Sequence, residues 1–533
     1  MKLETVTVNR FMGSEAQRFR SFSSANRQSS IVHPVRGDSM PVGWGKITAK
    51  EILGPVKGSL ISGDPETVLA GINTDSRIIR DGDLFWALRG ERYDGHDFAL
   101  KAIEKGSAGI VAQRSWVQSG WPVKDLDSVV ISVDDTLKAL GDLAAWWRRQ
   151  HNLKVVAITG SSGKTTTKEM VAAILELGHR TLKNQGNFNN LVGLPLTLLK
   201  LEEGYERAVL EMGMNRPGEI YRLTEIAHPD VGVILNVGMA HLEGLSDLDG
   251  VAKAKTELME KIPSRGLIIL NGDDGTLMKR ASVFSKQKMT FGLGEGNDVR
   301  AVNIRDNGPE GITFDLQYRD NSWPVRVRVP GLHNLGNALA AAAVGLSLSE
   351  PPENIVKGLD MFSGIKGRFR MVSLSKGITL VDDTYNANPS SLGAALASVS
   401  SLVNEGGKII VGLGEMLELG DATIHAHREA GRKVAEIGAY FFFAMGEHAG
   451  DMIEGARIAG MPENRLKIVE THDQMVKGII DTLTAGSLVF LKGSRKMELE
   501  KVTEGLSKDE GRMTKDEGLS NDEGRRRRMT NDY

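Results

Sequence analysis

Short apolar runs recur along the chain, and each is bounded by glycine, asparagine or aspartate. Runs of this length that are apolar throughout are typical of parallel strands buried on both faces. They are Val155–Ile158, Val231–Val237, Leu267–Leu270, Ile409–Val411, Tyr440–Ala444 and Leu488–Leu491. Helical spacing of apolar residues lies between many of them, as in Lys164–Leu177 and Asn334–Leu346. The alternation predicts an α/β protein with a central parallel sheet of the phosphate-loop type, a Rossmann-like C-terminal domain and a smaller α/β N-terminal domain.

The length of the chain supports this division. A chain of 533 residues holds about three domains at roughly 100–200 residues each. We expect the N-terminal domain at 44–150, the central domain at 151–362 and the C-terminal domain at 363–503. The second boundary falls where the sequence SGIKG, Ser363–Gly367, interrupts the pattern.

The two ends differ from the rest. Residues 1–43 are rich in arginine and serine and poor in acids, as organellar transit peptides are. We therefore expect a plastid stroma, with an extension on a cytoplasmic protein as the alternative. Residues 504–533 hold an imperfect polar repeat and are expected to be a disordered tail. Arg525–Arg528 fit a solvated tail better than an address signal.

Composition removes several classes of function. The net charge of −2 gives no overall basic field for nucleic acid. No apolar run approaches the roughly 20 residues that span a bilayer. Cysteine is absent, which excludes disulfides, thiolate metal sites and a cysteine nucleophile.

A strand, a glycine-containing loop and a helix follow one another near residue 160. Lys154–Thr159 (KVVAIT) is predicted as the strand, and the helix begins at Lys164. Backbone N–H groups and the helix N-terminus would face a polyphosphate, Lys164 would neutralise its charge, and the Thr165 hydroxyl would reach Mg²⁺. The spacing is GxxGKT, which is tighter than GxxxxGKT. The residues of this predicted ATP site are Gly160, Ser161, Ser162, Gly163, Lys164, Thr165 and Thr166.

Further motifs follow this loop in a fixed order, and together they resemble the Mur ligase family over roughly residues 44–500. They are Asn189-Asn190, Glu211-Met212-Gly213, Asn236 through Glu243, Ala252–Lys255, Gly331–Asn334 with Asn337, Gly367-Arg368, Asp382–Pro389 and Lys492–Arg495. Three segments resemble the branch of the family that adds D-alanyl-D-alanine: Asp75–Phe98, Ala240–Lys255 and Gly412–Gly420. The DNPR sequence of the branch that adds diaminopimelate does not occur.

The resemblance implies an ATP-dependent peptide ligase of peptidoglycan precursor synthesis. ATP would convert a carboxylate of UDP-N-acetylmuramoyl-tripeptide into an acyl phosphate, and the amine of D-alanyl-D-alanine would displace phosphate. Such phosphoryl transfer requires positioning and neutralisation of charge, so ATP and Mg²⁺ are the expected cofactors. A monomer is expected.

Four side chains are expected to carry the chemistry: Lys164, Glu211, His241 and Lys255. Glu211 follows the apolar segment Ala208–Leu210, at the sheet edge where α/β proteins bind ligands. We predict that Glu211 and Thr165 bind Mg²⁺. By the resemblance, His241 binds a second Mg²⁺ and Lys255 is carbamylated, so that both are metal ligands.

The resemblance also implies which residues bind nucleotide and substrate. Asn337 would approach the adenine, Arg368 the phosphates and Asp383 the ribose. In the N-terminal domain, Ser76, Arg77, Asp83 and His96 are expected in polar loops that hold the UDP group. The substrate cleft near the phosphate loop would be lined by Asn184, Asn187, Asn189 and Asn190, although an asparagine-rich loop is also good turn chemistry. Further contacts, to the substrate amine or to phosphates, are expected from Tyr385, Asn386, Asn388, Lys492, Ser494 and Arg495.

Two other functions remain open at this stage. One is a different acid–amino acid ligase of the same superfamily, such as a folylpolyglutamate synthase. The other is a scaffold of the same fold that has lost catalysis and serves in an organelle. The substantial domain before the phosphate loop argues against the first, and the intact Lys164, Glu211 and Asp383 argue against the second.

Overall fold

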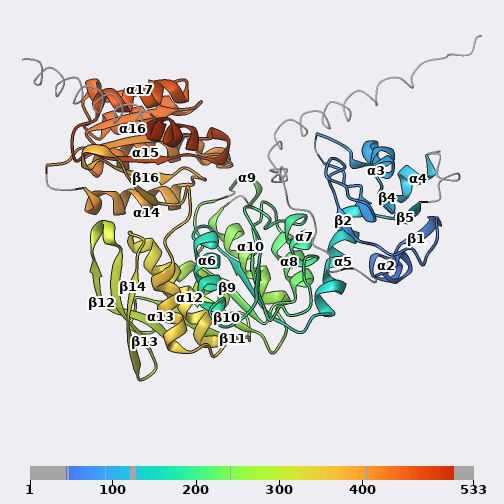
Figure 1. The fold of residues 1–533 in the computed structure, drawn as a ribbon. Coiled ribbons are helices and arrows are strands. Elements are labelled where there is room, and N and C mark those ends of the chain that lie inside the picture. The colour runs from blue at the N-terminus through green and yellow to red at the C-terminus, as the bar shows by residue number, and fades with distance from the viewer. Residues whose placement is uncertain are drawn as a thin grey trace, which may run out of the picture. The chain divides into compact units, whose positions relative to one another are not determined.

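A computed structural model describes residues 44, 47–90, 92–119, 128–240, 242–245, 247–403 and 406–508. The leader, Arg525–Arg528 and His241 lie outside the described residues, so the expectations for them stay predictions. The chain forms two compact units (Figure 1). Among the described residues, the first holds those up to Gln150 together with Gly186–Glu203, and the second holds His151–Gln185 and those from Gly204 onward.

The N-terminal unit is built on a five-stranded sheet of order β1-β5-β4-β3-β2. All neighbours are parallel except β1 and β5. The strands are β1 (Ser59–Ser62), β2 (Gly71–Asn73), β3 (Asp83–Trp86), β4 (Gly109–Gln113) and β5 (Val129–Val133). The helices are α2 (Ala49–Val56), α3 (Ala99–Glu104), α4 (Arg114–Gln118), α5 (Thr136–Arg149) and α7 (Gly193–Leu198), with a 3-10 turn η1 (Gly95–Phe98).

The placement of residues 186–203 differs from the predicted central domain of 151–362. Helix α7 packs against α5 of the N-terminal unit. The indole N–H of Trp147 donates to the Leu201 carbonyl at 3.1 Å, and that of Trp44 donates to the Leu199 carbonyl at 3.1 Å. The two indole rings stack with centroids 4.9 Å apart. These long-range contacts, which periodicity cannot reveal, hold the segment to the N-terminal unit.

The second unit begins with a nine-stranded sheet of order β14-β13-β12-β11-β10-β9-β6-β8-β7. Its strands are β6 (Lys154–Thr159), β7 (Thr181–Lys183), β8 (Arg207–Glu211), β9 (Val231–Ile234), β10 (Leu267–Asn271), β11 (Gln287–Gly292), β12 (Val299–Asp306), β13 (Ile312–Tyr318) and β14 (Asn321–Val327). Its helices are α6 (Lys164–Leu175), α8 (Glu219–Ala227), α9 (Leu242–Leu245), α10 (Leu248–Lys261), α11 (Gly275–Ala281), α12 (Leu332–Ser347) and α13 (Pro352–Met361). The predicted parallel strands and the helix that follows the loop are confirmed.

Strands β12, β13 and β14 are antiparallel and extend this sheet at one end. In β13, buried residues alternate with partly exposed ones, which is the pattern of a sheet with one covered face. The same core also holds α12, whose residues Ala340–Ala343 are buried. Because alanine side chains are small, α12 can approach α6 closely, and the two helices are in contact.

The chain continues into a six-stranded sheet of order β15-β16-β20-β17-β18-β19, in which only β15 is antiparallel. Its strands are β15 (Arg370–Ser373), β16 (Thr379–Asp383), β17 (Ile409–Gly414), β18 (Phe441–Met445), β19 (Leu466–Val469) and β20 (Leu488–Lys492). The helices are α14 (Pro389–Val399), α15 (Thr423–Glu436), α16 (Ala449–Ile458) and α17 (His472–Thr482). Residues of α14, α15 and α16 share one apolar core and those of α17 share another. Two cores on one mostly parallel sheet confirm the predicted Rossmann-like architecture.

The prediction that a disordered tail starts at residue 504 is wrong, because regular structure continues for at least five more residues. Residues 500–508 are helical. Leu499, Val502 and Leu506 lie in the same core as α17. Their spacing of three and four residues places them on one helix face, a short apolar stripe that the polar repeat conceals.

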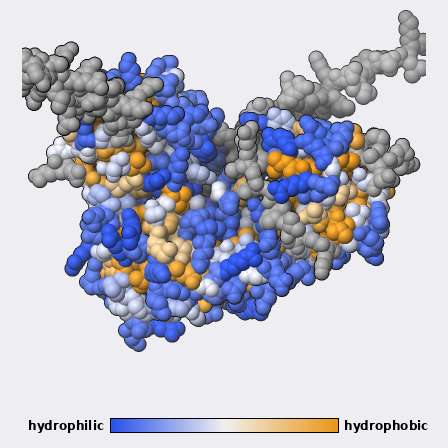
Figure 2. Space-filling view, in the orientation of Figure 1, coloured by the Kyte–Doolittle hydropathy of each residue, from blue (hydrophilic) through white to orange (hydrophobic). Residues whose placement is uncertain are grey.

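None of the helices in the described ranges combines the length and the apolar character needed to cross a bilayer. On the face drawn in Figure 2, hydrophilic residues dominate and hydrophobic residues form separate patches.

Leu506→Ala is expected to destabilise the C-terminal sheet by about 2–5 kcal/mol, because removing a buried leucine side chain leaves a cavity. Chemical denaturation followed by circular dichroism measures the change. Ile458→Ala is the control, since Ile458 is 74% exposed and its truncation should have little effect. An unfolding midpoint for L506A equal to that of the wild type would contradict the buried position of Leu506.

Candidate active site

The phosphate loop joins the end of β6 to the start of α6, as the sequence predicts. Gly163 caps α6 with a φ of 81°, in the left-handed region. A Cβ at Gly163 would lie 2.2 Å from the side-chain oxygen of Asn337, so only glycine fits. The first N–H groups of a helix have no acceptor within the helix. Those of α6 therefore suit an anion such as the phosphates of ATP.

Asn236 follows β9 and contacts this loop, although no role in the site was predicted for it. Its side-chain oxygen accepts from the backbone N–H of Ser161 at 3.0 Å and of Ser162 at 2.9 Å. The strand predicted over Val231–Val237 ends earlier, at Ile234, because Asn236 bonds to the loop and not to a neighbouring strand. An asparagine directly after a buried strand was the available signal for this role.

Glu211 is the last residue of β8 and is 2% exposed. One of its carboxylate oxygens accepts from the Thr165 hydroxyl at 2.7 Å. Mg²⁺ typically takes one or two carboxylates, phosphate oxygens and water, and a threonine hydroxyl beside a buried carboxylate fits that requirement. Within the described ranges, no group of three or more His, Asp or Glu side chains is placed to hold a metal ion.

Two lysines face this edge of the sheet. Lys164 is half-buried and donates to the Gly160 carbonyl at 2.9 Å. Burial lowers its pKa, the Glu211 carboxylate opposes that change, and the Arg368 guanidinium adds to it. Lys255 lies on α10, is 2% exposed, and has a pKa well below its usual value because of burial and the nearby Lys164. Among the described residues, no carboxylate forms an ion pair with Lys255.

Two arginines lie near Tyr385: Arg368 in the linker after α13 and Arg495 after β20. The Arg368 guanidinium lies 4.1 Å from the ring centre of Tyr385, and that of Arg495 lies 5.8 Å from the same ring. Because Arg368 also influences the pKa of Lys164, the structure brings the linker arginine to the phosphate loop.

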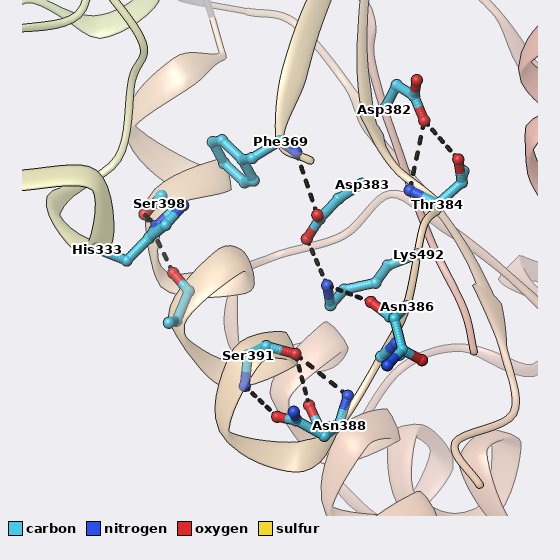
Figure 3. A network of polar contacts seen from close by, with 12 residues as sticks. His333, Phe369, Asp382, Asp383, Thr384, Asn386, Asn388, Ser391, Ser398 and Lys492 are labelled. Carbon is cyan, nitrogen blue, oxygen red and sulfur yellow. Dashed lines mark hydrogen bonds and ion pairs between the residues drawn. The ribbon is translucent and has the colours of Figure 1, made fainter. Parts of the chain in front are cut away.

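Asp383, at the end of β16, has both carboxylate oxygens engaged (Figure 3). One accepts from the backbone N–H of Phe369 at 3.1 Å, and the other accepts from Lys492 at 2.6 Å. Lys492 also donates to the Asn386 carbonyl at 2.9 Å. Burial raises the pKa of Asp383, and the ammonium of Lys492 opposes that rise. The pair therefore fixes the linker to β16 and β20.

Asn388 begins α14, where its side-chain oxygen accepts from Ser391 N–H at 2.8 Å (Figure 3). Its amide nitrogen donates to the Ser161 carbonyl of the phosphate loop at 3.4 Å. His333, near the start of α12, packs edge-on against Phe369 with ring centres 4.9 Å apart. Burial and the nearby Lys492 lower the pKa of His333 to about 4. Ser494 is 2% exposed, and its hydroxyl has no partner among the described residues.

Comparison with known proteins agrees with this site. Three family models match: the Mur ligase family catalytic domain over residues 68–148, the Mur ligase middle domain over 158–345 and the Mur ligase glutamate ligase domain over 367–495. The chain belongs to the Mur ligase family.

Three relatives of this Mur ligase show how far the similarity extends. The UDP-N-acetylmuramoyl-tripeptide–D-alanyl-D-alanine ligase of Bacillus subtilis is 36% identical over 462 residues, which are 86% of this chain and 98% of that protein. The crystal structure of MurF from Acinetobacter baumannii is 36% identical, with a TM-score of 0.79 over 87% of this chain and 99% of that chain. MurF ligase from Thermotoga maritima in complex with ADP is 28% identical, with a TM-score of 0.74 over 83% of this chain and 98% of that chain.

Two residues expected in polar loops of the N-terminal unit of this Mur ligase are buried in regular structure. Asp83 is the first residue of β3 and accepts from the Arg80 N–H at 3.0 Å. His96 lies in η1, where its ring nitrogens contact the Asp94 carboxylate at 2.5 Å and the Gln113 N–H at 2.9 Å. The loop expectation is wrong because each polar side chain binds backbone or a neighbouring side chain and can thus be buried.

The other expected substrate residues of this Mur ligase have mixed surroundings. Arg77 is exposed and pairs with Asp75 at 2.7 Å, and Ser76 beside it is buried. The Asn190 side chain accepts from the N–H groups of Val192 and Gly193 at the start of α7, as the turn alternative predicts. Asn189 is half-buried in the same loop.

Asp383→Asn is expected to cost about 3–5 kcal/mol of stability, because it leaves the buried ammonium of Lys492 without its carboxylate. The neighbouring Asp382→Asn is the control. Within the described part of the chain, the Asp382 carboxylate accepts hydrogen bonds only from Gly367 and Thr384, so its loss should cost about 1–3 kcal/mol. Denaturant unfolding compares the two, and equal losses would contradict the role assigned to Lys492.

Proposed function

We propose that this Mur ligase joins D-alanyl-D-alanine to UDP-N-acetylmuramoyl-tripeptide, with conversion of ATP to ADP and phosphate, in peptidoglycan precursor synthesis. The observation that carries the proposal is that the UDP-N-acetylmuramoyl-tripeptide–D-alanyl-D-alanine ligase of Bacillus subtilis matches this chain along 98% of its own length. The phosphate loop before α6, with Lys164 and Arg368 close to it, supports the proposal. The ADP complex of the Thermotoga maritima protein supports ATP as the cofactor.

Mg²⁺ fits the pair of Thr165 and Glu211, which would hold it beside the β- and γ-phosphates. When bound, the metal would draw charge from the phosphate oxygens and bring the carboxylate and the γ-phosphate together. Lys255, as a carbamate, and His241 are the proposed ligands of a second ion. A lysine carbamate supplies the anionic oxygens that Mg²⁺ prefers.

The chain's own residues would supply most of the remaining charge. Lys164 and Arg368 would neutralise the phosphates during transfer, and Asn337, packed on Gly163, would border the adenine. Asp383 would reach the ribose only if an oxygen now bound by Phe369 or Lys492 accepts a second donor, which a carboxylate oxygen can do.

Substrate contacts are assigned to both compact units. Arg77 has the exposure to meet a diphosphate, whereas His96 and Asp83 would act by shaping the sheet that carries it. Asn189 and Asn190 remain proposed for the substrate cleft. Contacts to the incoming amine or to phosphates are proposed for Tyr385, Asn386, Asn388, Lys492, Ser494 and Arg495.

The alternatives have less support. A scaffold that has lost catalysis would not need a carboxylate bonded to the loop threonine, nor a buried Lys255 that forms no ion pair with any described residue. The plastid location and the monomeric state stay predictions.

Purified protein is expected to release phosphate from ATP and Mg²⁺ only when both UDP-N-acetylmuramoyl-tripeptide and D-alanyl-D-alanine are present. Lys164→Ala should lower kcat by at least about 100-fold, since it removes a charge that stabilises the transition state. Lys154→Ala is the control, because Lys154 lies at the exposed start of β6 and pairs with Asp230. Phosphate release when one of the two substrates is omitted would contradict the proposal. So would the absence of phosphate release by the wild type with both substrates present.

Lys255 is expected to carry a carbamate. Its lowered pKa favours the neutral amine, which adds CO₂ to give the carbamate and a proton. Protein kept in ¹³C-bicarbonate should show a carbamate signal by NMR that Lys255→Ala removes and Lys253→Ala keeps, because Lys253 is exposed on α10. A signal that persists in K255A would refute the assignment.

A further inference from the structure

Lys168 is a buried lysine that the proposed mechanism does not use. It lies on α6, three residues after Thr165, and is 1% exposed. Its ammonium donates to the Asn184 carbonyl at 2.6 Å and lies 2.9 Å from the Glu169 carboxylate. Burying an ammonium group costs free energy unless the group is paired and hydrogen-bonded. The contacts with Asn184 and Glu169 offset this cost, and they leave open what Lys168 does at this position.

Asn184 connects Lys168 to Glu211. Strands β7 and β8 pair in parallel up to Lys183 and Val209, and Asn184 is the next residue. Its side-chain amide continues the pairing: the nitrogen donates to the Glu211 carbonyl at 2.9 Å, and the oxygen accepts from the Glu211 N–H at 2.9 Å. Asn184 is 1% exposed, so the backbone of Glu211 is held by a buried side chain.

These contacts close a ring that passes through Glu211, from its carboxylate to its backbone. Helix α6 reaches Glu211 directly through the Thr165 hydroxyl, at 2.7 Å. It reaches the same residue from behind through Lys168 and Asn184. Because Thr165 and Lys168 belong to one rigid helix, the ring fixes the distance between the threonine hydroxyl and the carboxylate.

We infer that Lys168 is a positioning residue that, through Asn184, holds Glu211 at the distance from Thr165 that Mg²⁺ requires. The inference rests on the proposed function of Thr165 and Glu211 as the magnesium site. Partners behind the ligands of a metal orient those ligands, and their loss commonly weakens metal binding by about 10–100-fold.

Lys183 provides a matched comparison within the same cluster. Its ammonium lies 2.9 Å from the other oxygen of Glu169 and 3.2 Å from Glu176. Lys183 is only half-buried. Replacing it removes the same charge beside the same carboxylate and leaves the contact between Lys168 and Asn184 in place.

The test compares Lys168→Met with Lys183→Met in the full chain. Calorimetry measures the affinity for a non-hydrolysable ATP analogue in Mg²⁺ and in EDTA, and the ratio of the two is the gain due to magnesium. K168M should lose about tenfold or more of that gain, with an affinity in EDTA within about twofold of the wild type, because the loop and Lys164 remain. K183M should keep both values.

Three results for the variants would overturn the inference: an unchanged magnesium gain in K168M, equal losses in Mg²⁺ and EDTA, or the same loss in K183M. If K168M does not fold, Asn184→Ser tests the next link and should show the same selective loss. A wild type that binds the analogue equally with and without Mg²⁺ would also overturn it. Phosphate release by the wild type tests the proposed ligation separately. If that test fails, the calorimetric comparison of the variants can still be interpreted.

Discussion

The hydrogen bond between the Thr165 hydroxyl and the Glu211 carboxylate is the contact on which the site depends. It joins the first turn of α6 to the end of β8, the strand beside β6. Parallel pairing sets Ile158 opposite Glu211, so the loop and the carboxylate emerge at the same edge of the sheet. The fold thereby places an acid within reach of a phosphate-binding helix, and the buried contacts behind Glu211 keep it there.

The charge around this contact explains why the site suits anions. Arg368 lowers the pKa of Lys164, Lys164 lowers that of Lys255, and Glu211 is the one acid among the causes that shift the pKa values of these lysines. Asp383 offsets little of the positive charge at this site, because its carboxylate is already paired with the Lys492 ammonium. ATP and a substrate carboxylate would bring the missing negative charge. Burial is the main cause of the lowered pKa of Lys164 and Lys255, and a neighbouring cation adds to it in each case.

Local pattern was sufficient for much of the fold and part of the site. The strand Lys154–Thr159, the helix start at Lys164, the strand end at Glu211 and the helical position of Lys255 all follow from periodicity within a few turns of chain. The contacts of Asn236, Asn184 and Lys168 could not be predicted, because each joins elements that are distant in sequence. The same limit applies to residues 186–203, whose position depends on two distant indoles. Burial of His96 likewise required knowledge of its partners Asp94 and Gln113.

The fate of oxygen during ligation tests the central claim most directly. UDP-N-acetylmuramoyl-tripeptide labelled with ¹⁸O in the reacting carboxylate is turned over with ATP and D-alanyl-D-alanine, and the released phosphate is examined by mass spectrometry. If Lys164 and the Glu211 site direct the γ-phosphate onto that carboxylate, the phosphate acquires one ¹⁸O atom, because the amine displaces phosphate together with the bridging oxygen. Unlabelled phosphate, or label found in AMP, would contradict the account.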